Sequence, residues 1–431
     1  MTMNLTEKQQ KAFNLMIAGK NIFLTGPSGS GKSAVINLFK ETHGRRLNIA
    51  ITSTTGISAL LIGGSTLHSY LGIGLGNGTV DEIAKKIMTN SKCRQRWCDL
   101  DMLIIDEVSM LSPELFDKLE QVSRIVRRKK AKRMLCDDGE TERPFGGVQL
   151  VLSGDLLQLP VVGNSDSFIF DAECWERCID EVVVLEKIMR QENKEFQNVL
   201  NEVRVGVVSR KGMEMLNSRI GAKLKNELGI LPTRIYTTNA QVDQMNNLEL
   251  DKIGEETVYQ YDMEVYFYEF VKNRDQMLEK YRKSSLAPES LQLCRRAQVM
   301  LVCNLDLENG LANGSRGVVI DIVEDVPIVR FLNGEERVIS HWQWEIEEDR
   351  KKQVRITQIP LKLAWAQTIH KAQGSTIDYA EMDLSNVFTY GQAYVALSRV
   401  KTLEGLSIID ISYEAVKAHP KALEYYRKIK G

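Results

Sequence analysis

The sequence predicts an α/β protein built on parallel β-sheets, and three observations lead to that class. A glycine-rich loop stands between an apolar run and a helical segment, which is the order of a nucleotide-binding unit. Further apolar runs alternate with helical segments along the first part of the chain. From about residue 255 to residue 355 the pattern changes to short apolar runs and Asn-Gly pairs, which predicts a small β-barrel inserted in an α/β lobe.

The glycine-rich loop, Gly26–Ser33, reads Gly-Pro-Ser-Gly-Ser-Gly-Lys-Ser and has the spacing of a phosphate-binding loop. Its backbone N–H groups can turn inward around phosphate oxygens because glycines permit that turn. Lys32 supplies a charge for the β- and γ-phosphates, and Ser33 a hydroxyl for Mg²⁺. The run Asn21–Thr25 is typical of the buried strand before such a loop, and Ala34–Lys40 of the helix after it. We therefore expect a nucleotide site here.

Three more runs are predicted as strands of one parallel sheet covered on both faces: Leu47–Thr52, Met102–Asp106 and Val148–Ser153. The second run ends in two acids. Asp106, at the carboxyl edge of a strand beside the phosphate loop, can hold Mg²⁺ through water. Glu107 is then placed to orient and deprotonate the attacking water. The alternative is two acids that begin a surface helix.

Three further side chains are candidates for the same site. Gln158, in the segment Gly154–Pro160, follows a strand, so its amide can bond both the γ-phosphate and water; the alternative is a capped turn. Arg190 and Arg399 are candidates for transition-state partners that reach the γ-phosphate from the opposite lobe. Such a contact would couple hydrolysis to lobe closure. A single arginine would by default be assigned to a surface ion pair, so this prediction depends on Arg190 and Arg399 being considered together.

The remaining segments complete the outline. Thr6 and Gln9 match a capping box, and the alternative use of the Gln9 amide is adenine recognition. A second set of α/β signals begins near Val182. The α/β pattern resumes at Ile359 and ends in an amphipathic helix from about residue 415 to residue 429.

Composition narrows the class of protein. The 431 residues are too many for one core, and 43% hydrophobic with 26% charged residues is typical of a soluble globular chain. The net charge of −1 means that a nucleic-acid binder would need its basic residues gathered in one groove. No apolar stretch has the length of a membrane span, and the N-terminus lacks a signal or transit pattern. We expect no membrane partner.

Seven dispersed cysteines predict an intracellular, reducing compartment, without separating nucleus from cytoplasm. Neither Cys93 with Cys98 nor Cys174 with Cys178 has the spacing of a zinc knuckle, so free thiols are favoured.

The basic run Arg127–Arg133 is followed by an acidic block, Asp137, Asp138, Glu140 and Glu142. A helix end with a solvated loop is favoured over a patch for a nucleic-acid backbone, because the acids would cancel much of the field.

Taken in order, these motifs resemble those of superfamily 1 DNA helicases of the petite-integration-frequency (PIF-type) family, which are related to phage Dda-type helicases. The resemblance covers nearly the whole chain. Besides the loop, acids and arginines, it includes Leu5–Gln9, Thr55–Ala59, Gly64–Ser69, Met110 through Gly147, Gly154–Pro160, Thr368–Thr376 and Gly391–Arg399. Three departures stand out: Leu156 with Leu157 replace aromatics, Val161 replaces a second proline, and Ala372 replaces a serine.

The resemblance implies two RecA-like P-loop NTPase lobes with ATP and Mg²⁺ between them and single-stranded DNA across their top. It places the first lobe at residues 1–183, with a small wedge subdomain at about 70–97. It places the second lobe at residues 184–254 plus 356–431, and an SH3-like β-barrel insertion at residues 255–355.

The resemblance also implies roles for single residues. Those implied for ATP are Gln9 at the adenine, Gly26, Gly29, Ser30, Gly31, Lys32, Ser33 and Gly374 at the cofactor, and Asp106, Glu107, Gln158, Arg190 and Arg399 in catalysis. Those implied for DNA are Thr55, Gly56, Thr66, His68, Asn239, His370 and Lys371. A neutral histidine can donate one hydrogen bond to a phosphate, although a lone histidine is as readily a packed side chain.

The implied activity is ATP-driven translocation from 5′ to 3′ on single-stranded DNA, with unwinding of duplex or folded DNA in replication, repair or recombination. The implied partners are single-stranded DNA and duplex or quadruplex junctions, and we expect a monomer in solution. Two alternatives stay open: an RNA helicase of the same superfamily, since phosphate contacts alone do not distinguish the sugars, and a nucleotide-gated clamp that binds DNA without unwinding it.

Overall fold

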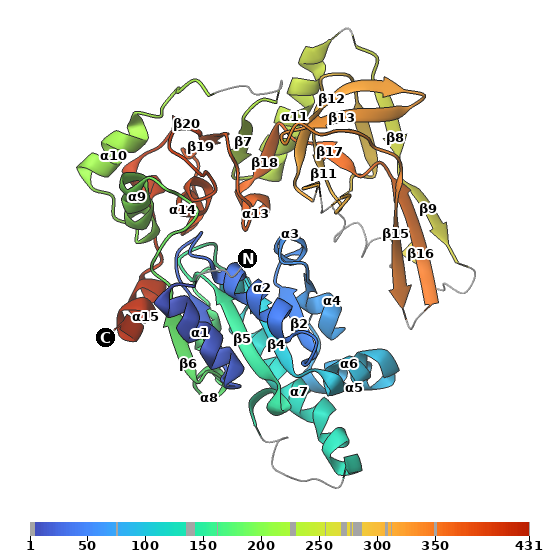
Figure 1. Ribbon diagram of the computed structural model, residues 1–431, viewed down its shortest axis with the longest axis vertical. Helices are drawn as coiled ribbons and strands as arrows, with labels where there is room; N and C mark the ends of the chain where they lie inside the picture. The colour runs from blue at the N-terminus through green and yellow to red at the C-terminus, as the bar shows by residue number, and fades with distance from the viewer. Residues whose placement is uncertain are drawn as a thin grey trace. The chain divides into compact units, whose positions relative to one another are not determined.

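The computed structural model describes residues 5–74, 76–134, 143–161, 163–224, 230–254, 256–268, 274–275, 278, 287–306, 309–311, 313–348 and 351–430 (Figure 1). The chain forms two compact units. The first comprises Met1–Ser218, Ser385–Leu403 and Ile411–Gly431, and the second Arg219–Leu384 and Glu404–Asp410. Within the described residues, no helix has both the length and the apolar character needed to cross a membrane.

A six-stranded parallel sheet forms the centre of the first unit, in the order β3-β2-β4-β5-β1-β6. Its strands are β1 (Ile22–Thr25), β2 (Ile49–Ser53), β3 (Ser65–Thr66), β4 (Met102–Asp106), β5 (Gln149–Gly154) and β6 (Glu181–Val184). The strands predicted around the phosphate loop are confirmed. The run near Val182 corrects the prediction: it pairs with β1, so it closes this sheet and does not open a second set of elements.

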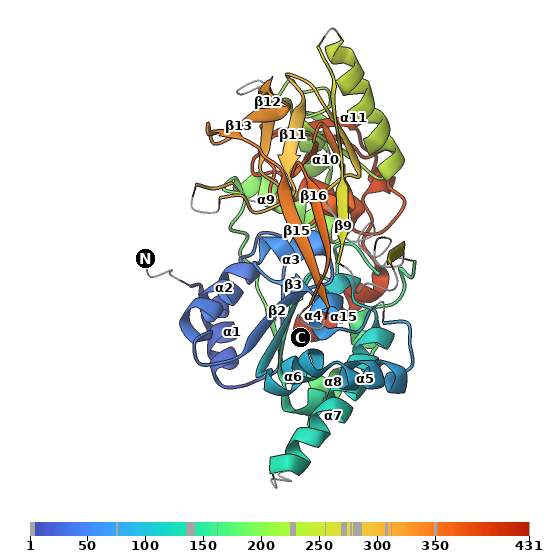
Figure 2. The same ribbon diagram turned by 90° about the vertical axis from the view of Figure 1, so that its right-hand side faces the viewer.

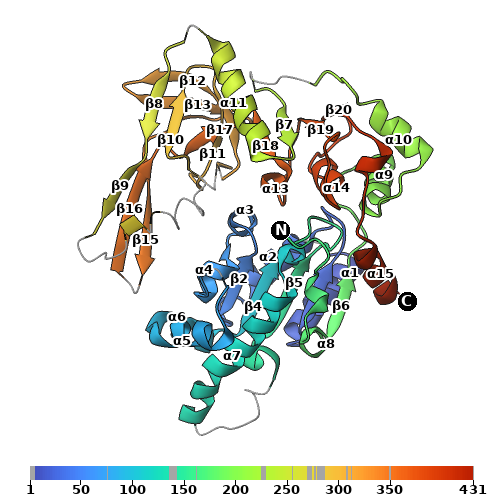
Figure 3. The same cartoon turned by 180° about the vertical axis from the view of Figure 1, so that it is seen from behind.

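Helices cover both faces of this sheet (Figure 3). The helices of the first unit are α1 (Glu7–Ile17), α2 (Lys32–His43), α3 (Gly56–Leu61), α4 (Leu67–Leu71), α5 (Val80–Thr89), α6 (Ser91–Asp99), α7 (Pro113–Met134), α8 (Trp175–Cys178), α9 (Lys194–Arg204), α10 (Arg210–Asn217), α14 (Gln392–Leu397) and α15 (Pro420–Lys430). Successive side chains of β1 enter different cores: Phe23 packs with α7, while Ile22 and Leu24 pack with α1 and α2. A strand buried on both faces needs such an unbroken apolar run.

Helices α5 and α6, within the segment predicted as a wedge, pack on α7 through Ile83, Ile87 and Trp97. Arg127, the first residue of the basic run, is a structural anchor here. Its Nη1 donates to the carbonyl oxygens of Trp97 (2.6 Å) and Leu100 (3.0 Å). The run continues α7 to Met134, so this part is helical. The acidic block from 137 to 142 lies outside the described residues.

The second unit contains a four-stranded parallel sheet, in the order β18-β7-β19-β20. Its strands are β7 (Thr233–Tyr236), β18 (Ala366–Thr368), β19 (Ala380–Asp383) and β20 (Leu406–Asp410), with helices α11 (Asn239–Ile253) and α13 (Ile369–Ala372). A parallel sheet in each unit confirms the predicted α/β class.

The β-rich segment forms antiparallel sheets in the second unit (Figure 2). Five strands follow the order β14-β13-β12-β11-β17, three the order β15-β16-β9, and β10 pairs with β8. Their bounds are β8 (Tyr259–Asp262), β9 (Glu264–Phe267), β10 (Ser290–Leu293), β11 (Gln298–Leu301), β12 (Arg316–Val323), β13 (Val326–Phe331), β14 (Glu336–Val338), β15 (Trp342–Glu348), β16 (Lys351–Gln358) and β17 (Leu361–Leu363). A closed SH3-like barrel stays a prediction.

Candidate nucleotide site

The phosphate loop connects β1 to α2 in the first unit, as the sequence predicts. Two positions of the loop require glycine because neighbouring side chains leave no room for a Cβ atom. A Cβ atom at Gly29 would lie 2.6 Å from the Cβ of Arg190, and one at Gly31 would lie 2.4 Å from the Nε2 of Gln9. Both glycines have positive φ angles, 74° and 84°. The loop is therefore a cradle that larger residues would fill.

Gln9 serves the loop and the first helix at once. Its Oε1 accepts from the N–H of Thr6 (2.9 Å), and its own N–H donates to the Thr6 hydroxyl (3.4 Å), which confirms the capping box. Its Nε2 donates to the Ser30 carbonyl (3.2 Å) in the phosphate loop. One side chain thus caps α1 and touches the loop, while its contact with adenine stays a prediction.

Lys32 lies among the carbonyls and carboxylates of the loop region. Its Nζ donates to the carbonyl oxygens of Gly26 (2.8 Å) and Pro27 (3.0 Å). Burial lowers the pKa of Lys32, and the nearby charges of Asp155 and Glu107 oppose that effect. The amine is therefore held inside the cradle, where a phosphate charge would stabilise its protonated form.

The two predicted acids end β4. Burial raises the pKa of Asp106 above its usual value, and the charge of Lys32 opposes that effect. Glu107 has φ 54° and ψ 44°, a left-handed conformation that is uncommon outside glycine. A three-residue 3₁₀ helix, Val108–Met110, follows at once. The strained turn is of the kind found at functional sites, and it re-aims the side chain after the strand.

Arg190 and Arg399 meet on one hydroxyl of the phosphate loop. The Nη1 of Arg190 donates to the Ser28 Oγ (2.8 Å), and the Nη2 of Arg399 donates to the same atom (2.6 Å). Both also bond Ser398, Arg190 at its carbonyl (2.9 Å) and Arg399 at its hydroxyl (2.8 Å). Burial and the charge of Arg190 lower the pKa of Arg399. All of these residues lie in the first unit, together with the loop.

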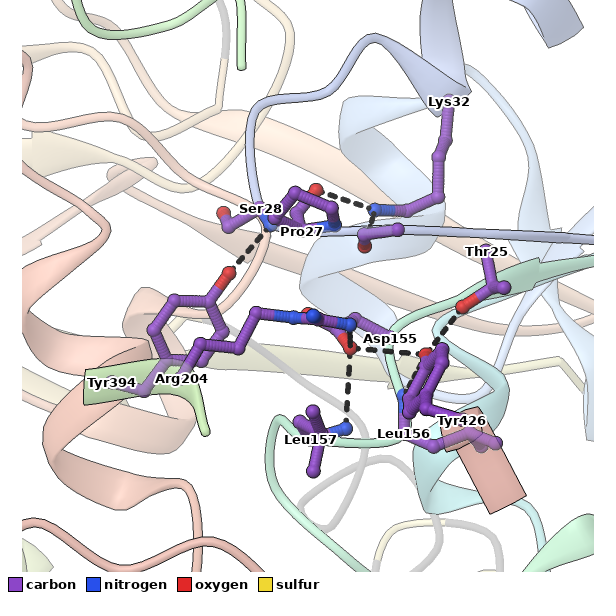
Figure 4. Close-up of polar contacts among 11 residues, drawn as sticks. Thr25, Pro27, Ser28, Lys32, Asp155, Leu156, Leu157, Arg204, Tyr394 and Tyr426 are labelled. Atoms are coloured by element: carbon purple, nitrogen blue, oxygen red, sulfur yellow. Dashed lines mark hydrogen bonds and ion pairs between the residues drawn. The ribbon is translucent and has the colours of Figure 1, made fainter. Parts of the chain in front are cut away.

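A buried network beside the loop was not predicted from the sequence (Figure 4). The Nε and Nη2 of Arg204 donate to the two carboxylate oxygens of Asp155, each at 2.8 Å. Tyr426 donates to Asp155 Oδ1 (3.1 Å), and Tyr394 OH accepts from the Ser28 N–H (2.7 Å). Burial alone would raise the pKa of Asp155, but the Arg204 charge lowers it below its usual value. In the sequence, the Gly154-Asp155 pair in the segment after β5 was the one local signal of this network.

Two buried polar atoms of the site have no hydrogen-bond partner among the residues that the structure describes: Ser30 Oγ and Gln158 Oε1. Gln158 lies where the loop after β5 approaches α14, since a Cβ at Gly391 would be 2.5 Å from the Gln158 carbonyl oxygen. The open cradle, the cationic groups and these unpaired atoms fit a nucleoside triphosphate. Ser33 and Asp106 are the residues that could hold Mg²⁺, the latter through water.

The predicted DNA residues divide between the units. Thr55 and Gly56 follow β2, while Thr66 caps α4, on which His68 lies; burial lowers the pKa of His68. Asn239, His370, Lys371 and Gly374 belong to the second unit, where burial lowers the pKa of His370. A shared DNA path, and the contact of Gly374 with ATP, stay predictions.

Comparison with known proteins gives consistent matches. The PIF1-like helicase profile matches residues 4–214, and a profile for the DNA helicase Pif1 2B domain matches residues 277–322. The chain is 37% identical to the ATP-dependent DNA helicase PIF1 of Xenopus laevis, over 99% of this chain and 64% of that protein.

Two solved structures show the same fold. The Pif1 helicase of Candida albicans matches with a TM-score of 0.86 and 33% identity, over 99% of this chain and 100% of that one. The Pif1 helicase of Bacteroides in complex with ADP-AlF3 and single-stranded DNA matches with a TM-score of 0.72 and 31% identity, over 99% and 98%. This chain belongs to the PIF1-like helicase family.

Proposed function

We propose that the protein is an ATP-dependent DNA helicase that hydrolyses ATP to ADP and phosphate while moving along single-stranded DNA. The observation that carries this proposal is the meeting of Arg190 and Arg399 on Ser28 of the phosphate loop. Two guanidinium groups at that place suit the charge that develops during phosphoryl transfer. The Bacteroides relative, crystallised with ADP-AlF3 and single-stranded DNA, supports both the nucleotide and the DNA.

Each residue then has a task in hydrolysis. The loop N–H groups and Lys32 bind the phosphates, while Ser33 and Asp106 hold Mg²⁺. Glu107 orients the attacking water and accepts its proton. Arg190 and Arg399 stabilise charge on the transferred group, a contribution of about 10³–10⁵ in rate for arginines in this role. Bound ATP supplies the phosphoanhydride bond whose cleavage drives the cycle.

The direction of movement is 5′ to 3′, and the substrates include duplex and folded DNA such as quadruplex junctions. The resemblance of its motifs to those of PIF-type helicases supports this. The protein acts as a monomer in solution, in an intracellular, reducing compartment. Among the described residues, Cys93, Cys174, Cys178, Cys294 and Cys303 are free thiols, which supports that compartment.

The test is ATP hydrolysis by the full chain with and without single-stranded DNA. We expect stimulation by DNA that Lys32→Ala lowers at least about 100-fold, because the γ-phosphate loses its charged ligand. Lys20→Ala, which removes an exposed lysine just before β1, serves as the matched control and keeps the wild-type rate. A Lys32→Ala rate within twofold of wild type would refute the proposed site.

Two alternative activities are separated in the same assay. Matched DNA and RNA strands are compared, and stimulation by RNA alone would support an RNA helicase, since only a 2′-OH contact distinguishes the sugars. Tight DNA binding with no hydrolysis would support a nucleotide-gated clamp, for which the Leu156 and Leu157 departures are the motive.

A further inference from the structure

The last helix of the chain, α15, is built into the core of the first unit. Ala422 and Tyr426 are buried within the core that also contains Phe23 and Trp175. The ring of Tyr425 stacks on Phe170, with centroids 4.3 Å apart and planes at 5°. These contacts fix the position of the helix without any use of the Tyr426 hydroxyl.

That hydroxyl joins two elements that border the phosphate cradle. It bonds the Oγ1 of Thr25, the last residue of β1 and the one directly before Gly26. It also accepts from the Leu156 N–H (3.2 Å) and donates to Asp155 Oδ1 (3.1 Å), both in the loop after β5. A phenol offers one donor and two acceptor positions, so all of its hydrogen-bonding capacity is used.

Asp155 connects the Tyr426 hydroxyl to the charged side chains of the site. Its carboxylate receives two hydrogen bonds from Arg204, and the N–H of Leu157 donates to its Oδ1 (3.2 Å). Its carbonyl oxygen accepts from the N–H of Gln158 (3.0 Å). Asp155 is also the nearby charge that acts most strongly on the pKa of Lys32. The turn that aims Gln158 is therefore held at its first residue by Tyr426 and Arg204.

We propose that Tyr426 is a positioning residue for ATP hydrolysis, which sets the placement of Gln158 relative to the phosphate loop by joining Thr25 to Asp155. The inference deepens the proposed ATPase function and rests on it. Tyr426 touches no reacting atom, so its effect is on the rate of the chemical step and little on nucleotide binding. The C-terminal helix thereby becomes part of the hydrolytic apparatus.

The test compares two changes of the same chemistry on one helix. Tyr426→Phe removes the hydroxyl and keeps the ring, which also lies under the Arg204 guanidinium at 4.8 Å. Tyr425→Phe is the matched control, because its ring packs against Phe170 and Trp175. We measure kcat and KM for ATP of the full chain, with saturating single-stranded DNA and without DNA, alongside the melting temperature.

For Tyr426→Phe we expect kcat to fall about tenfold with KM for ATP within about twofold, since a buried hydrogen bond to a charged group is lost. Thr25→Val removes the partner hydroxyl in β1 without altering α15 and is expected to give the same fall. The double variant should lose little more than either single one, because both remove the same link.

A Tyr426→Phe kcat within twofold of wild type would overturn the proposal. So would a loss matched by Tyr425→Phe, or a loss that follows only the melting temperature. Failure of DNA to stimulate the wild-type enzyme would instead count against the helicase function, and the kcat ratio without DNA would still decide the role of Tyr426.

Discussion

Ser28 brings two positive charges to one oxygen atom, so its two arginines are expected to act as a unit. Arg190 and Arg399 share the Ser28 hydroxyl and both bond Ser398. Replacing either by alanine should lower kcat by about 10³ because charge on the transferred group loses a donor. The double variant should lose far less than the product of the two effects, since groups that act together are not additive.

Steady-state hydrolysis with saturating DNA checks this, and Arg210→Ala serves as the control. Arg210 makes an exposed i,i+4 ion pair with Glu214, so its loss should leave the rate unchanged. Strict additivity of the two single effects would contradict the shared role.

The Asp155–Arg204 pair gives a prediction for stability. Asp155 is fully buried, and Arg204 is nearly so. Asp155→Asn leaves a buried guanidinium without its counter-charge, so unfolding in urea at pH 7 should show a loss of roughly 3–5 kcal/mol.

The difference between wild type and Asp155→Asn should also depend on pH. The folded pKa of Asp155 lies below its ordinary value, so the pair's contribution is present above about pH 4 and is lost as the pH falls through the folded pKa. The two proteins should therefore converge in stability at strongly acid pH. A constant difference over the whole range would show that the carboxylate charge is not the cause.

At the scale of elements, the approach of the β5 loop to α14 requires a glycine. Gly391 caps α14 with φ 73°, and a Cβ there would lie 2.5 Å from the Gln158 carbonyl oxygen and 2.7 Å from that of Leu157. Gly391→Ala should destabilise the first unit by about 2–3 kcal/mol and lower hydrolysis, because strain at φ is joined by a clash with backbone.

Gly19→Ala is the control that separates the cost of the positive φ angle from the cost of the clash with backbone. Gly19 has nearly the same φ, 72°, and an added Cβ would meet no atom within 4 Å. It should therefore destabilise the protein by only about 1 kcal/mol and leave hydrolysis intact. Thermal unfolding and ATPase rates of both variants provide the comparison, and equal effects would remove the argument for a close approach.

Local sequence patterns correctly predicted those elements whose structure is determined by residues close together in the sequence. The phosphate loop between strand and helix, the strand Met102–Asp106 and the Thr6–Gln9 capping box are set by residues only a few positions apart. A second set of α/β signals was predicted to begin near Val182, but this run pairs with β1, because a short apolar run does not reveal which sheet it joins. Arg127 was expected at a solvated helix end, yet it bonds backbone carbonyls.

The residues of the candidate site also differ in whether local sequence could predict them. Its phosphate loop and acids follow from motif spacing, whereas Tyr426 meets Asp155 across 271 positions and Arg204 meets it across 49. Partners so distant are chosen by the tertiary fold, and neither Tyr426 nor Arg204 stands in a motif with its own chemistry. The sequence therefore predicted the groups proposed to bind the nucleotide, but not the residues that hold those groups in place.

At the scale of the whole molecule, each of the two units contains a parallel sheet. Of the properties proposed for this protein, the direction of movement along single-stranded DNA is the one that depends least on any single residue.

The central claim is that ATP hydrolysis at this site drives directional DNA unwinding. The measurement is strand release from duplexes that carry a single-stranded tail on the 5′ side or on the 3′ side, with ATP and Mg²⁺. We predict release from the 5′-tailed duplex alone, and none from either duplex with Lys32→Ala. Release from the 3′-tailed duplex alone would contradict the direction, and hydrolysis without release from either duplex would contradict the helicase itself.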